Sequence, residues 1–156
     1  MSIVDILSLE RVAVSLPGED KHVRNKEQAL RRLAELLAQP GVSAERIFEV
    51  LEARERLQST GVGGGVAVPH GAVEELTEQV GAFLVCREPI GFDAIDGEPV
   101  TILFALVGPK GAPAQHLKVL ARVSRLLRNA GFRSELGAAD SGETVYRMIA
   151  QRDGAS

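Results

Sequence analysis

Residues 60–71 carry the densest chemical signal in the chain, and they read TGVGGGVAVPHG. Four of the five residues in 61–65 are glycine, which costs backbone entropy and is typical of a backbone that must approach another group closely. Successive N–H groups in such a segment can bind an anion such as phosphate. The spacing fits neither the dinucleotide fingerprint nor the P-loop, since the third glycine and the Gly-Lys-Ser/Thr ending are missing. By itself the loop indicates an anion site without specifying the anion.

His70 is the first candidate for chemistry because of the two residues that flank it. Pro69 has a fixed φ and pushes Val68 towards an extended conformation, while Gly71 lets the chain turn immediately afterwards. The imidazole is thus expected at a stiff strand end, with little bulk around it to keep out another macromolecule. A surface histidine in a turn is the alternative, but these neighbours favour a reactive imidazole.

His116 is the second candidate. Pro113 is expected near the start of a helix, which places His116 in the first turn beside free N–H groups and the positive end of the helix dipole. That position lowers the pKa of a histidine and favours a bound anion. A hydrogen-bonded core histidine would show the same spacing, so both interpretations stay open. His22 lies in a polar stretch and is predicted to be a solvated bystander.

The remaining polar residues have structural interpretations. Residues 54–56 are a charged run that is typical of a solvated helix face, although Arg54 could reach an anion held at the loop. Asp93 and Asp96 are predicted to form turns rather than an acid/base pair. Cys86 is predicted to be a small core residue, and no metal motif is found. A basic stripe predicted to be a solvated face consists of Lys118, Arg122 and Arg125.

The elements that position these residues alternate between two periods. Helical spacing of apolar residues covers 25–38, 43–57, a long helix from Pro113 and a last helix from Asp140 towards Ile149. On the long helix the apolar residues expected to face inwards are Leu117, Leu120, Ala121, Leu126 and Leu127. Strands are predicted at 11–16, 66–68, 80–86 and 100–107, the last two buried and central, with 58–65 a loop.

These elements predict one α/β domain over residues 1–156, a mixed β-sheet flanked by helices, with frayed ends at 1–4 and 152–156. An apolar content of 45% excludes a disordered chain. The net charge of −3, five Phe, one Tyr and no Trp argue against nucleic-acid binding. With no signal peptide and no apolar run near the ~20 residues of a membrane span, we expect a cytoplasmic protein without membrane insertion.

The stretch STGVGGGVAVPHG closely resembles the active-site segment of the type-2 IIA proteins of the bacterial phosphoenolpyruvate-dependent phosphotransferase system, the mannitol/fructose class. Similarity continues through IGFDAIDGEPVTILFAL at 90–106 and QHLKVLARVSRLL at 115–127. The FDAID segment and the stand-alone length are similar to the nitrogen-regulatory branch. One departure is Gly64, where that branch commonly has Asn, and we expect it to change loop flexibility more than chemistry.

The resemblance implies a phosphotransferase that works through a phosphohistidine and needs no cofactor. It implies that His70 carries the phosphoryl group on Nε2, that His116 stabilises it, and that Arg54 adds charge. The implied phosphate-binding loop comprises Thr60, Gly61, Gly63, Gly64 and Gly65. The implied donor is a histidine-phosphorylated carrier protein. Regulated transport or kinase proteins that read the phosphorylation state are the implied targets.

Three functions are compatible with this resemblance. A nitrogen-type regulatory IIA protein is the first hypothesis. A sugar-specific IIA component of a fructose- or mannitol-type transport system is the alternative, with identical chemistry and a different acceptor. A protein-interaction module whose His70 is never phosphorylated is a third possibility. The sequence does not identify the donor, the targets, the phosphorylation state that binds them or the oligomeric state.

Overall fold

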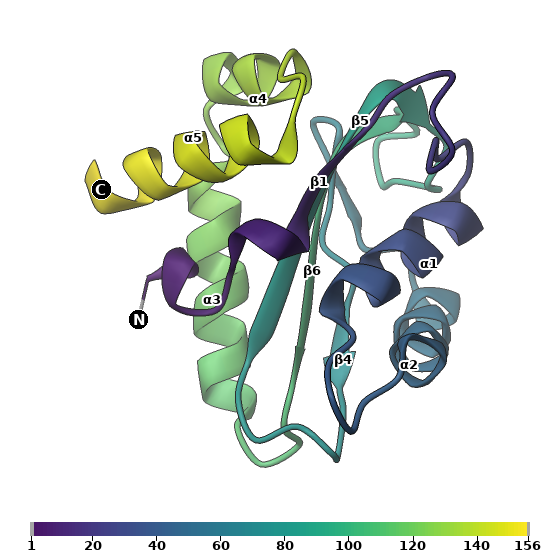
Figure 1. Cartoon of the computed structure of the whole chain (residues 1–156), viewed down its shortest axis with the longest axis vertical. Coiled ribbons are helices and arrows are strands. Elements are labelled where there is room, and N and C mark those ends of the chain that lie inside the picture. The colour runs from purple at the N-terminus through teal and green to yellow at the C-terminus, as the bar shows by residue number, and fades with distance from the viewer. Residues whose placement is uncertain (1, 156) are drawn as a thin grey trace.

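The computed structural model describes residues 2–155 and shows a central sheet between two layers of helices (Figure 1). One layer consists of α1 (Lys26–Leu37) and α2 (Ala44–Leu57). The other layer consists of α3 (Pro113–Leu126), α4 (Ala130–Gly137) and α5 (Gly142–Ala155). Two 3₁₀ turns, η1 (Ile3–Asp5) and η2 (Leu9–Arg11), precede the first strand. The predicted fold class, a mixed sheet flanked by helices, is confirmed.

The sheet has six strands, and its order is β1-β5-β6-β3-β2, with β4 also paired to β6. The strands are β1 (Val12–Ser15), β2 (Gly61–Gly63), β3 (Val66–Ala67), β4 (His70–Ala72), β5 (Val80–Ile90) and β6 (Val100–Gly108). The long central pair β5 and β6 is antiparallel, whereas β1 runs parallel to β5, and β3 and β4 run parallel to β6. This mixture of directions brings the end of β3 and the start of β4 onto one central strand.

The central strands are apolar throughout because both of their faces are covered. On β5, Phe83 and Val85 pack with the α3–α5 layer, while Ala82 and Leu84 pack with the α1–α2 layer. Successive side chains of a strand point to opposite faces, so a strand covered on both sides needs apolar residues at every position. The nearly continuous apolar runs in the sequence therefore correctly predicted two buried strands.

Side-chain caps set the starts of the helices. Asn25 accepts a hydrogen bond from the N–H of Gln28 at 2.9 Å, and Ser43 accepts one from the N–H of Arg46 at 3.1 Å. The last helix begins later than predicted, at Gly142, because Ser141 supplies the cap by accepting from the N–H of Thr144 at 3.2 Å. Asp140, the expected cap, instead pairs with Arg87.

The two ends of the chain, for which the sequence predicts fraying, contact each other among the described residues. The side chain of Ile3 is buried, and its N–H donates to Oδ2 of Asp153 at 2.8 Å. Helix α5 continues to Ala155, so this hydrogen bond joins the two ends of the chain. Met1 and Ser156, which the same prediction included, lie outside the described residues.

The inward face predicted for α3 is partly wrong. Leu117 is 65% exposed and Ala121 is also exposed, whereas Val119 and Val123 are buried. Leu126 is buried as expected. The face that packs on the sheet is thus rotated from the predicted one, and it leaves Leu117 in the solvent beside His116.

Candidate functional site

His70 is the first residue of β4 and is held by backbone groups. The carbonyl of Pro69 accepts from the N–H of Leu106 on β6 at 3.0 Å, which pins the chain just before the histidine. The ring Nδ1 of His70 lies 2.8 Å from the carbonyl oxygen of Val68. A carbonyl oxygen only accepts, so in the neutral ring Nδ1 carries the proton and Nε2 keeps its lone pair. The tautomer of His70 is therefore set by a backbone group two residues away.

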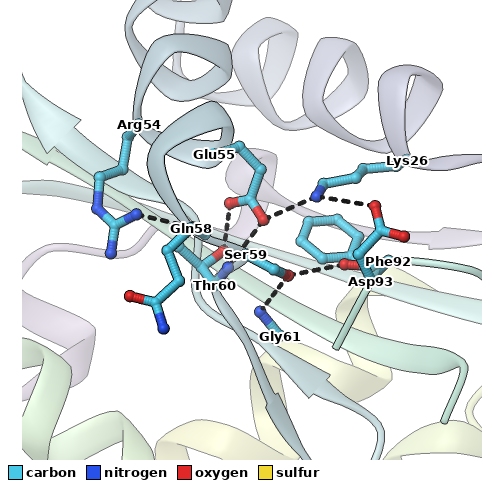
Figure 2. A network of polar contacts seen from close by, with 9 residues as sticks. All are labelled: Lys26, Arg54, Glu55, Gln58, Ser59, Thr60, Gly61, Phe92 and Asp93. Atoms are coloured by element: carbon cyan, nitrogen blue, oxygen red, sulfur yellow. Dashed lines mark hydrogen bonds and ion pairs between the residues drawn. The ribbon is translucent and has the colours of Figure 1, made fainter. Parts of the chain in front are cut away.

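Helix α2 packs directly beside this residue. A Cβ atom at Gly71 would overlap Cγ1 of Val50, so only glycine allows the helix to lie this close to His70. Arg54 follows Val50 by one helical turn on the same face. Its Nη1 donates to the carbonyl oxygen of Gln58 at 2.8 Å, which holds the guanidinium at the start of the loop (Figure 2).

His116 lies in the first turn of α3, behind Pro113, as predicted. Its ring centroid is 5.5 Å from that of His70, with the two ring planes inclined at 56°. Burial lowers the pKa of His116 to about 4, and the neighbouring charge of His70 adds to the effect. The sequence left a core histidine and a site histidine as equal alternatives. The contact with His70 favours the second, with a ring that is neutral near pH 7.

Glu55 is the site's main surprise, since the charged run at 54–56 was expected to be solvated. Only 6% of Glu55 is exposed. Its Oε1 accepts from the N–H of Thr60 at 2.8 Å and lies 3.1 Å from Nζ of Lys26, while its Oε2 accepts from the Thr60 hydroxyl at 2.5 Å (Figure 2). The buried carboxylate is thus compensated by a cation and two donors. The available signal was its spacing, because Glu55 follows Ile47 and Leu51 on the buried face of α2.

The hydrogen bonds continue from Glu55 to the histidine. The N–H and hydroxyl groups of Thr60 donate to Glu55, as described above. The carbonyl of Thr60 accepts from the N–H of Val68 at 2.9 Å. The carbonyl of Val68 then accepts from Nδ1 of His70. Glu55 and His70 are therefore joined through Thr60 and Val68. This path couples the orientation of the imidazole to the start of the glycine loop.

The glycine turn lies at the other end of the loop from His70. Gly63, Gly64 and Gly65 have φ values of +96°, +67° and +78° and make the turn between β2 and β3. Val66 pairs with Ile102 and His70 with Leu106, four residues further along β6, so roughly 13 Å separates the two points. Thr60 lies near His70, whereas the three glycines of the turn lie away from it.

Two N–H groups of the predicted phosphate-binding loop have partners within the chain. Gly64 donates to Oδ2 of Asp96 at 3.1 Å, and Gly61 donates to Oγ of Ser59 at 3.1 Å. The turn thus binds a carboxylate of this chain, as expected for a glycine turn that favours anions. Hydrogen bonds from the N–H groups of Glu98 and Gly64 lower the pKa of Asp96, which is a turn former as predicted. A phosphoryl oxygen at Gly61 or Gly64 would replace these partners.

The prediction for His22 is wrong. Its side chain is only 6% exposed, and its Nε2 lies 3.6 Å from Oε1 of Glu88 on β5. The residues on either side of His22 in the sequence are polar, so nothing local indicates that the fold covers this ring. Cys86 is a buried residue of the core as predicted, and burial raises the pKa of its thiol to about 12.

Among residues 2–155, no group of three or more His, Cys, Asp and Glu side chains could hold a metal ion. Within the same range, none of the helices is long and apolar enough to span a membrane.

Residues 15–152 match the family model described as the phosphoenolpyruvate-dependent sugar phosphotransferase system, EIIA 2. The chain therefore belongs to the type-2 EIIA family, as the resemblance at residues 60–71 suggested. The curated relatives include proteins named nitrogen regulatory protein, and a solved structure with the same name superimposes on nearly the whole chain.

Three of these similar proteins show where the chain lies within the family. The nitrogen regulatory protein of Bradyrhizobium diazoefficiens is 40% identical over 151 residues, which is 96% of this chain and 95% of that protein. The crystal structure of the nitrogen regulatory protein IIA-Ntr from Neisseria meningitidis has a TM-score of 0.83 at 37% identity and covers 94% of this chain and 98% of that one. A fructose-specific EIIA component of Haloferax volcanii is 30% identical over 153 residues, covering 97% and 98%.

Proposed function

We propose that this chain is a nitrogen-type regulatory IIA protein that accepts a phosphoryl group on Nε2 of His70 from a histidine-phosphorylated carrier protein. The observation that carries the proposal is the 2.8 Å contact between Nδ1 of His70 and the carbonyl of Val68. That contact leaves Nε2 unprotonated and therefore nucleophilic, beside a second histidine that burial keeps neutral near pH 7.

The transfer needs no metal or nucleotide in this proposal. The lone pair of Nε2 attacks phosphorus, the new N–P bond forms as the N–P bond of the donor breaks, and the donor imidazole leaves with its electron pair. Because both bonds join phosphorus to an imidazole nitrogen, the reaction is nearly balanced and the protein mainly supplies position and charge stabilisation. His116 and Arg54 would stabilise the phosphoryl oxygens.

The glycine loop would serve the site through its two ends. Thr60 and Gly61 lie at the end tied to Val68, from which they can help to hold a phosphoryl group on His70. Gly63, Gly64 and Gly65 would shape the turn that Asp96 closes. In this assignment Thr60 and Gly61 belong to the site at His70, whereas the three glycines of the turn, which lie away from His70, only shape the loop.

Regulation would follow from the charge that the phosphoryl group adds. A phosphohistidine brings about −1.5 to −2 of charge to a surface where two large apolar side chains, Val62 and Ile95, are exposed near the loop. The N–H of Ile95 donates to the carbonyl of Gly61 at 3.0 Å, so this surface and the loop are continuous. A cytoplasmic partner that contacts this surface could bind one phosphorylation state and not the other.

The test is intact-mass analysis after incubation with phosphoenolpyruvate, the general first enzyme and a phosphocarrier protein. We expect one acid-labile phosphate on the unmodified chain and none on His70→Ala, with unchanged circular dichroism for both. Equal phosphate on His70→Ala would disprove the site. No phosphate on the unmodified chain with any cognate carrier would disprove phosphotransfer and favour an interaction module.

A sugar-specific IIA component is the second candidate, favoured by the relative from Haloferax volcanii named as a fructose-specific EIIA component. The phosphorylated chain can be mixed with the IIB domain of a fructose- or mannitol-type permease. Rapid transfer of the phosphoryl group to that domain would favour sugar transport. Retention of the phosphoryl group on His70 would favour regulation.

A further inference from the structure

Gln79 connects His116 to the sheet. It immediately precedes β5, and the pairing of Val80 with Val107 places it across from Gly108 at the end of β6. A Cβ atom at Gly108 would overlap the amide of Gln79, so glycine there makes the room that this amide occupies. Gln79 is only 5% exposed, and its Oε1 lies 3.0 Å from Nδ1 of His116.

The other end of the same amide has no partner. Nε2 of Gln79 is buried and makes no hydrogen bond within the described residues. A buried amide nitrogen without an acceptor is unfavourable, and in this orientation the only donor group of the amide makes no hydrogen bond within the described residues. A half-turn about the last side-chain bond exchanges the oxygen and the nitrogen with little change in shape. After that turn the nitrogen lies where it can donate to Nδ1 of His116.

The position of the ring proton depends on which end of the amide faces the histidine. If Oε1 faces it, a neutral His116 holds its single proton on Nδ1, and Nε2 presents a lone pair. If the amide nitrogen faces it, the proton must be on Nε2, which then is a donor. Since Gln79 occupies Nδ1 of His116, Nε2 is the ring nitrogen that remains for a group bound at His70. If that group is an anionic oxygen, Nε2 must carry the proton in order to donate to it.

We propose that Gln79 is a positioning residue that donates its amide N–H to Nδ1 of His116 and so holds the ring proton on Nε2, facing His70. The chain then presents two neutral imidazoles of opposite tautomer. His70 keeps its proton on Nδ1 and offers a lone pair, while His116 keeps its proton on Nε2 and offers a donor. The kinetic consequence rests on the proposed function, but the tautomer is a property of the unphosphorylated chain.

The experiment reads the tautomer directly. Long-range ¹H–¹⁵N correlation spectra of chain labelled with ¹⁵N-histidine separate protonated from unprotonated ring nitrogens. We expect His116 of the unphosphorylated chain to be protonated on Nε2 at pH 7.5, and to become a mixture of tautomers in Gln79→Met, which keeps the volume and removes the amide. Gln151→Met, the same change at an exposed position of α5, should leave the spectrum of His116 as it was.

A second variant keeps the test independent of the folding of Gln79→Met. A carboxylate in Gln79→Glu has the shape of the amide but only accepts, so it should move the proton of His116 to Nδ1. Protonation of Nδ1 in the unmodified chain would overturn the proposal. So would a tautomer that is the same in all of these variants.

Phosphoryl transfer supplies the functional half of the test. We expect Gln79→Met to accept phosphate about tenfold more slowly than the unmodified chain, and Gln79→Glu to be slower still at pH 8. Rates equal to that of Gln151→Met would show that the tautomer does not serve the transfer. If the unmodified chain accepts no phosphate, the proposed function fails, while the spectra still decide which ring nitrogen of His116 carries the proton.

Discussion

His70 and His116 lie with ring centroids 5.5 Å apart, yet different kinds of group hold them. A backbone carbonyl, that of Val68, binds Nδ1 of His70, whereas a side-chain amide, that of Gln79, binds Nδ1 of His116. A carbonyl can only accept, which determines one tautomer, while an amide can accept or donate. The tautomer of His70 therefore follows from the path of the backbone, whereas that of His116 depends on the side chain of one residue, Gln79.

The groups that bind Nδ1 of the two histidines are themselves held in place in different ways. The segment before His70 is tied through Thr60 to the buried Glu55 and Lys26, so its position depends on charged groups of α1 and α2 (Figure 2). Gln79 instead packs against Gly108 within the sheet. Charged groups thus hold the segment before His70, whereas the room left by a glycine positions the side chain that binds His116.

Removal of Glu55 should have the largest effect on the His70 side. Glu55→Ala leaves the two donors of Thr60 without their acceptor and leaves Lys26 with only the exposed Asp93 as an ion-pair partner. We expect a loss of about 3–5 kcal/mol in the free energy of unfolding. Urea unfolding measures it. Glu52→Ala, one turn earlier, breaks only a surface pair with Arg56 and should cost less than about 1 kcal/mol. Equal losses would mean that the buried network does not support the loop.

Loss of His116 should slow the transfer without removing the acceptor. His116→Ala removes one group that stabilises the phosphoryl oxygens, and we expect a rate about 10²-fold lower with the same final amount of phosphate on His70. Rapid-quench measurement of phosphorylated chain against time gives both quantities. An unchanged rate would assign His116 to the core rather than to the site.

The low pKa of His116 predicts a pH dependence of stability. In the unfolded chain this residue binds a proton near pH 6.5, and in the folded chain only near pH 4. Between these values the unfolded state holds more protons, so this residue's contribution falls as pH falls from 6.5 to 4 and is constant above 6.5. Above pH 6.5, the free energy of unfolding should therefore change with pH in the same way in the unmodified chain and in His116→Ala. Between pH 6.5 and 4, it should fall less steeply with falling pH in the variant.

Replacement of Gly64 should have the smallest effect. Asn tolerates a φ near +67° better than other side chains, and a Cβ there would lie 3.4 Å from the guanidinium of Arg133, an ordinary contact. We expect Gly64→Asn to change the free energy of unfolding by no more than about 0.5 kcal/mol and to leave the transfer rate unchanged. A large loss of transfer would show that the glycine turn acts on His70 despite its distance.

The long elements and the short strands β1 and β3 were predictable from the sequence, whereas three other short elements were not. The apolar spacing in 25–38 and 43–57 and the runs at 80–86 and 100–107 correspond to α1, α2, β5 and β6. The prediction missed β2, β4 and α4, which have three, three and eight residues. The two short strands exist through their pairing with distant residues, such as His70 with Leu106, which no local pattern records. For α4 a signal existed, since Asn129 caps it.

The sequence by itself determined how the backbone binds the ring of His70, because this contact is local. Pro69 favours an extended chain at Val68, and Nδ1 of His70 bonds to a carbonyl only two residues away. The turn expected at Gly71 is absent, because residues 70–72 form strand β4 and pair with β6. Only the tertiary structure decided that Glu55 is buried, that His116 meets His70, and that Gln79 meets His116. These contacts join residues from separate elements, and they depend on how the helices pack on the sheet rather than on any spacing along the chain.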